Sequence, residues 1–136
     1  MVRRVTRARI AALHVALPLA LGAASYVVFR SWVPLYSAHW GAHAALWPNA
    51  PRALSDHFAD AAWGWSLGGF VMVVWFDQER AHRVAWTFVA ASVAAAYEIF
   101  LGGRFDRVDL VAQTLAVIVA AGIIGGKTWT TSREAR

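Results

Sequence analysis

The chain has 136 residues, which is room for one domain, and 59% of them are hydrophobic while only 15% are charged. A soluble domain is typically about 25% charged, so this composition, with eight Trp and a mean hydropathy of +0.45, indicates an integral membrane protein. The net charge of +5 does not indicate a nucleic-acid partner, because the basic residues gather toward the two termini and form no continuous basic face. The absence of Cys excludes disulfides, Cys metal ligands and Cys nucleophiles.

The first apolar run, at residues 8–29, predicts a membrane-spanning helix, since it is longer than the roughly 7–15 apolar residues of a signal peptide. Pro18 removes one backbone hydrogen bond from this helix and predicts a kink near its middle. We interpret His14, in the inner half of the helix, as a hydrogen-bonded packing residue. Ligation of a pigment or haem iron by His14 stays open as the alternative.

The long loop that follows, residues 30–55, predicts a short amphipathic helix lying on the outer membrane surface. Aromatic and histidine residues fall on one helical stripe of this loop: Tyr36, His39, Trp40, His43 and Trp47. His39 and His43 have the spacing of metal ligands. The loop offers neither a carboxylate nor a thiol, so we interpret both as interfacial residues without a ligand role.

Three further apolar runs, at residues 57–76, 84–101 and 108–125, are each about as long as the roughly 20 residues that cross a hydrocarbon core. No run alternates with the period of a barrel strand, and backbone groups in lipid must be satisfied within the segment, so all are predicted helices. The predicted fold is an all-α integral membrane four-helix bundle, one domain over residues 1–136, with the interfacial helix in its first outer loop.

Small residues at intervals of four predict where these helices approach closely. The second span has such a pair and the fourth span has such a row: Gly64 and Gly68, then Ala112, Ala116 and Ala120.

Lys and Arg residues predict the orientation of the bundle. With the N-terminus inside, nine of them lie on inner segments and four on outer ones. This predicts a multi-pass protein of the bacterial inner (cytoplasmic) membrane with both termini in the cytoplasm. The inner loop at residues 77–83 is then a charged, solvated turn, and Trp75 and Trp86 mark the inner interface.

Polar residues from three separate segments are predicted to meet at the outer end of the bundle. They begin the second helix, end the third and begin the fourth, in that order: Asp56, His57 and Asp60; Glu98 and Arg104; Asp106, Asp109 and Gln113. We take these eight as candidate ligand-binding residues, and we assign no catalytic residue and no metal ligand.

An ionised carboxylate in such a place is costly without a cationic partner. The guanidinium of Arg104 is the natural partner, because it can fork onto carboxylates, and His57 is the second candidate. We expect Arg104 within hydrogen-bond reach of Glu98, Asp60 or Asp109.

Structural explanations of the same residues stay open beside the ligand-binding one. Asp56 and Asp109 stand near helix starts, where Asp residues cap free backbone N–H groups. Asp60, Glu98 and Gln113 are not explained by capping, but they are explained equally well as interhelical hydrogen-bonding residues.

The order of these motifs resembles the VanZ-like family of small bacterial membrane proteins. That family has an Asp shortly before a His-Phe pair, then a Glu, a Gly-Arg, a Phe-Asp and an Asp-x3-Asn that opens the last helix. The matching positions are His57-Phe58, Glu98, Gly103-Arg104, Phe105-Asp106 and Asp109, and the match covers residues 54–121, about half of the chain. The chain departs from the pattern at Gln113, where the family has Asn, and at Asp56, which directly adjoins His57.

The resemblance implies a role in the cell envelope, since the family is named for a protein linked to low-level resistance to the glycopeptide teicoplanin. The favoured function is therefore a non-catalytic envelope protein whose outer cluster binds a polar head group or a cation. The alternative is an accessory or structural subunit of a larger membrane complex, in contact with a pigment or cofactor through an intramembrane His. A metal-assisted enzyme is disfavoured, because the sequence offers no evident nucleophile–base pair. The expected partners are membrane lipid and other membrane chains, not nucleic acid, and no cofactor is identified.

Overall fold

The computed structural model describes residues 2–29, 45–100 and 106–134, which form four helical rods and no strand. The prediction of an all-α fold is thereby confirmed for these residues. The first rod is continuous through three elements and the others are single helices: α1 (Val2–Ala11), η1 (Ala12–Ala16) and α2 (Leu17–Phe29); then α4 (Arg52–Val74), α5 (Arg80–Phe100) and α6 (Arg107–Glu134).

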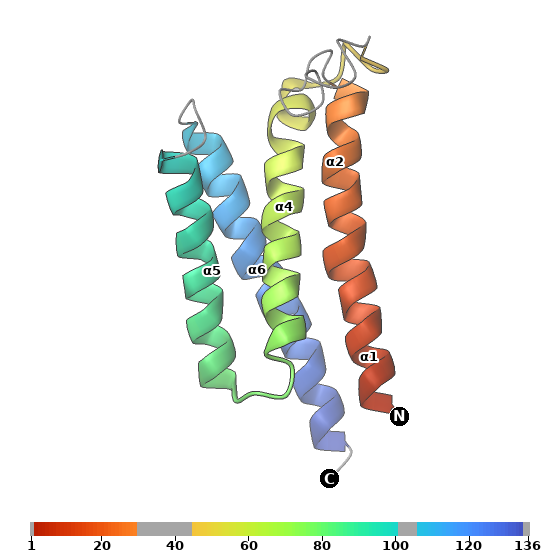
Figure 1. Ribbon diagram of the computed structural model, residues 1–136, viewed down its shortest axis with the longest axis vertical. Coiled ribbons are helices and arrows are strands. Elements are labelled where there is room, and N and C mark those ends of the chain that lie inside the picture. Colours follow the sequence, from red (N-terminus) through yellow and green to blue (C-terminus); the bar gives the residue numbers. More distant parts are fainter. Residues whose placement is uncertain (1, 30–44, 101–105, 135–136) are drawn as a thin grey trace.

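The rods run alternately up and down, so the start of α1 and the end of α6 lie at the same end of the molecule (Figure 1). We call this the tail end. The opposite end holds the starts of α4 and α6, and we call it the cluster end.

Two segments are long and apolar enough to cross a membrane, Thr6–Phe29 and Arg107–Gly126. The helices α4 and α5 have 23 and 21 residues, so their lengths are comparable, but both carry more polar residues. The predicted interfacial helix falls largely on residues 30–44, outside the described residues. At its end, the backbone N–H of Trp47 donates to the Val28 carbonyl at 2.8 Å and the Trp47 ring lies 6.0 Å from that of Phe29.

Pro18 disturbs the first rod, but one turn earlier than the predicted kink. The element η1 is a single turn of π-helix, in which the Leu17 N–H donates to the carbonyl of Ala12. Within this turn, the Val15 carbonyl lies 3.1 Å from the Ser66 hydroxyl of α4, which shares its one hydrogen with the Ala62 carbonyl of its own helix at 2.9 Å. Helix α4 therefore contacts the first rod by a polar group at its irregular turn.

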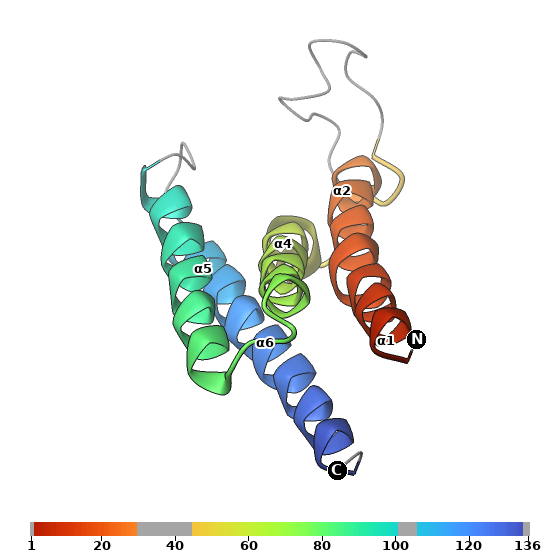
Figure 2. The same cartoon turned by 60° about the horizontal axis from the view of Figure 1, so that its bottom comes forward.

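Helix α4 lies between the first rod on one side and α5 and α6 on the other, in both views of the molecule (Figures 1 and 2). The glycines of α4 allow its backbone to approach that of α6 closely. A Cβ atom at Gly64 would overlap the backbone carbonyl of Gln113 in α6, and one at Gly68 would overlap that of Val117. The predicted close approach through Gly64 and Gly68 is confirmed, because only a residue without Cβ fits there.

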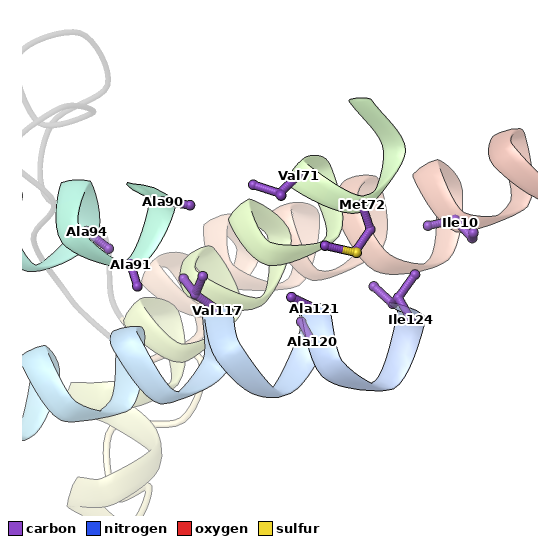
Figure 3. Close-up of a cluster of buried hydrophobic side chains, with 10 residues drawn as sticks. All are labelled: Ile10, Val71, Met72, Ala90, Ala91, Ala94, Val117, Ala120, Ala121 and Ile124. Atoms are coloured by element: carbon purple, nitrogen blue, oxygen red, sulfur yellow. The ribbon is translucent and has the colours of Figure 1, made fainter. Parts of the chain in front are cut away.

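The buried core at the middle and tail end is made mainly of small side chains (Figure 3). Val117 and Ala120 of α6 are fully buried, and Ala90, Ala91 and Ala94 bring α5 against them. In a bilayer, where apolar side chains gain little from leaving lipid, such close packing of small residues is what holds helices together.

At the tail end, Arg7 closes the C-terminus of α4. Its Nε donates to the Val73 carbonyl at 2.7 Å and its Nη2 to the Val74 carbonyl at 3.0 Å, which satisfies two of the carbonyls that a helix end leaves unpaired. Its Nη1 lies 3.8 Å from a carboxylate oxygen of Asp77. Residues 77–82 are exposed, as predicted for a charged, solvated segment, but the turn is shorter than predicted because α5 already begins at Arg80.

Two glycines of the bundle offer a matched test of this packing. Gly64→Ala should lower the free energy of unfolding by about 1–3 kcal/mol, because the new methyl group forces α4 and α6 apart. Gly122→Ala should raise it by about 0.5–1 kcal/mol, since a Cβ there meets nothing within 4 Å and alanine favours the helix. Unfolding in detergent micelles with rising SDS, followed by circular dichroism, measures both. Equal stability of the two variants would contradict the proposed contact.

Candidate functional site at the cluster end

A hydrogen-bonded pair joins α4 and α6 at the cluster end. The Nδ1 atom of His57 lies 2.5 Å from Oδ1 of Asp109, and the two side chains are 24% and 19% exposed. A carboxylate paired with an imidazole is stabilised more strongly in such partly shielded surroundings than in open water. Among the described residues, the side-chain partner of Asp109 is therefore His57, which was the second candidate after Arg104.

The close approach of the two helices sets this pairing. Gly64 meets Gln113, and Gly68, one turn later, meets Val117, so α4 and α6 run parallel in fixed register. His57 lies two turns before Gly64 and Asp109 lies one turn before Gln113. The register thus brings the first turns of both helices together at the cluster end.

Asp106 immediately precedes α6 and caps its N-terminal end. Its Oδ1 accepts a hydrogen bond from the backbone N–H of Val108 at 2.8 Å, and its carbonyl accepts one from Leu110 at 3.1 Å. Neither Asp56 nor Asp109 occupies an N-cap position, so that part of the capping alternative is wrong, but Asp109 does lie where its charge favours the helix dipole. Pro51 occupies the N-cap position of α4, and Asp109 lies inside the first turn of α6.

Three side chains converge closely enough to bind one ion. Ligand atoms of His57, Asp106 and Asp109 all lie within 4.8 Å of one another. One imidazole nitrogen and two carboxylate oxygens form a donor set that suits zinc or manganese, and three protein ligands leave positions for water or a further ligand. With a neutral imidazole the set carries two negative charges, so it favours a cation of any kind.

The remaining candidate ligand-binding residues lie near His57, Asp106 and Asp109 or fall outside the described residues. Asp56 precedes His57 and is exposed, while Asp60 is half-buried about two turns into α4. Arg104 lies outside the described residues, as does the side chain of Glu98, so the expected pairing of Arg104 with a carboxylate stays a prediction.

Gln113 lies one turn beyond Asp109 on α6. Its side-chain oxygen is buried and has no hydrogen-bond partner among the described residues. The role of an interhelical hydrogen-bonding residue is therefore not seen for this oxygen in the described part of the chain. A buried acceptor of this kind is costly unless a donor reaches it.

The other histidines give less support to a cofactor site. The indole N–H of Trp65 donates to His14 Nδ1 at 3.3 Å, and the two rings stack with centroids 6.1 Å apart. This contact supports the interpretation of His14 as a packing residue. His39 and His43 lie outside the described residues.

Comparison of the chain with protein-family models, with curated proteins and with solved structures finds no match. The similarity to the VanZ-like family therefore rests on the motifs alone, and the geometry of the cluster carries the functional argument.

The pairing of His57 with Asp109 can be measured by a double-mutant cycle. His57→Gln, Asp109→Asn and the double variant should show a coupling energy of about 1–3 kcal/mol, because the hydrogen bond involves a charged acceptor in a shielded site. A parallel cycle of His57→Gln with Asp77→Asn, at the tail end, should be additive. Additive effects in both cycles would show that the pair contributes nothing to stability.

Proposed function

We propose that the chain is a non-catalytic, four-span protein of the bacterial cytoplasmic membrane that binds a cation at its cluster end. The observation that carries the proposal is the convergence of His57, Asp106 and Asp109 from two helices, with ligand atoms within 4.8 Å.

The surfaces of the helices support membrane insertion of all four rods. Large apolar side chains point outward on α5, where Phe88, Val93 and Phe100 are 67%, 59% and 79% exposed. Apolar surface of this extent is unfavourable in water but suits contact with lipid or with another membrane chain. We therefore include α4 and α5 among the membrane spans.

The charge of the cluster supports a cation as the ligand. Two carboxylates meet one imidazole, and Asp56 adds a further negative charge close by. Attraction between a cation and this set is stronger at the edge of a bilayer than in bulk water, because the surroundings are less polarisable. A divalent metal ion and the ammonium group of a lipid head group both satisfy this chemistry.

The envelope setting of the proposal comes from the VanZ-like resemblance. In the predicted orientation the cluster faces outward, where it meets the head groups of the outer leaflet and compounds that enter the envelope. The family's association with a lipid-bearing glycopeptide is compatible with a site of this kind.

Binding can be tested on the full chain purified in detergent. Titration calorimetry with Mn²⁺ or Zn²⁺, and separately with phosphatidylethanolamine, should detect one ligand per chain. Asp109→Asn should weaken binding at least about tenfold, because it removes one of the two charges that attract the cation.

The matched control is Asp77→Asn, which removes the same charge at the tail end and should leave the affinity unchanged. Equal affinity of the Asp109→Asn protein would show that the cluster is structural. The accessory-subunit function would then be the better explanation.

The orientation is a separate prediction. Because nine of the Lys and Arg residues lie on the inner segments, a reporter that is active only in the cytoplasm should be active when fused to either terminus. The same reporter inserted after Trp47 should be inactive. The reverse pattern would move the cluster to the cytoplasmic face.

A further inference from the structure

We propose that a second site, at the tail end, binds the anionic head group and one acyl chain of a phospholipid such as phosphatidylglycerol. The site is a cavity of about 420 Å³ between α4, α5 and α6, distinct from the cation cluster at the opposite end. The proposal depends on the membrane insertion inferred above, but not on the binding of a cation.

The cavity lies where α5 and α6 diverge (Figures 1 and 2). In both views α5 and α6 lie close together near the cluster end and separate toward the tail end (Figures 1 and 2). The buried side chain of Met72 in α4 forms part of the wall, and the volume is within the range of about 300–1,000 Å³ that is typical of small-molecule sites.

The wall contributed by α6 is shaped by glycine. A Cβ atom added at Gly122 or at Gly126 would meet nothing within 4 Å, so the space above both residues is open. On the facing helix, Phe88 lines the cavity and is 67% exposed. A groove whose α6 wall has three glycines beside Ile118 and Ala121, and whose other wall has an aromatic ring, suits an extended hydrocarbon chain.

The mouth of the cavity is basic. Arg80 and Arg83, in the first turn of α5, both line it, and the N-terminal end of that helix adds partial positive charge. The acids of the same segment do not line the cavity, and Asp77 is held by Arg7. Two guanidinium groups above an apolar groove are complementary to a phosphate diester joined to an acyl chain.

The location of the site agrees with this ligand. In the proposed orientation the tail end is cytoplasmic, and basic pockets between spans on that side are where anionic head groups bind. A soluble protein partner would need no groove for a chain, and a zwitterionic lipid would gain less from the two arginines.

Native mass spectrometry of the full chain in detergent tests the proposal. Lipids with identical acyl chains are titrated, and the wild-type protein should bind phosphatidylglycerol about tenfold or more tightly than phosphatidylcholine. The double variant Arg80→Ala/Arg83→Ala should lose this preference. The matched control Arg9→Ala/Arg107→Ala, which removes the same charge outside the cavity, should keep it.

A second pair of variants tests the groove. Gly122→Leu fills the open space above α6 and should weaken phosphatidylglycerol binding, whereas Val119→Leu, an exposed position that does not line the cavity, should not. Soluble glycerol phosphate should bind far more weakly than the lipid. Equal binding of glycerol phosphate, or equal lipid preference in the arginine variant and its control, would overturn the proposal.

Carbonate extraction of membranes from the same cells separates this inference from the proposed function. If the protein resists extraction and shows no lipid preference, the tail-end site alone is wrong. If carbonate releases the protein, membrane insertion is wrong and both proposals fail.

Discussion

The contact between the backbones of α4 and α6 at Gly64 and Gly68 determines how the rest of the bundle is arranged. It fixes the register of two parallel helices and so decides which side chains meet at the cluster end. Parallel helices place both positive dipole ends together, which is unfavourable unless negative charge lies nearby. Asp106 and Asp109 supply that charge at the start of α6. The cluster is thus an electrostatic requirement of the packing as well as a candidate site.

The opposite face of α4 also makes a close backbone contact through a glycine, in this case with the first rod. A Cβ atom at Gly69 would overlap the backbone carbonyl of His14, and the Ser66 hydroxyl reaches the Val15 carbonyl at 3.1 Å. These contacts fall on the π-helical turn before Pro18, so α4 packs directly against the irregular part of the rod.

The sequence predicted the helices, the close approach at Gly64 and Gly68, and the arrival of several acids at one end, since all of these follow from periodicity and segment order. It did not predict the particular partners. Which of Asp106 and Asp109 caps α6 and which faces His57 depends on the rotation of each helix about its axis, and hydropathy leaves that rotation undefined. The role of Arg7 was missed for a related reason: a basic residue before an apolar run reads as a topology signal whether or not a helix end lies beside it.

The two ends of the bundle differ in their charged residues: acids gather around His57 at the cluster end, and arginines gather at the tail end. Basic residues gather at the tail end, which holds Arg7, Arg80 and Arg83, and in the proposed orientation this end lies in the cytoplasm. The acids near the starts of α4 and α6 are left at the other side, where they balance the helix dipoles. In the proposed orientation, the same distribution of charge would orient the chain in the membrane and favour cations at the proposed cluster-end site and anions with an apolar chain at the proposed tail-end site.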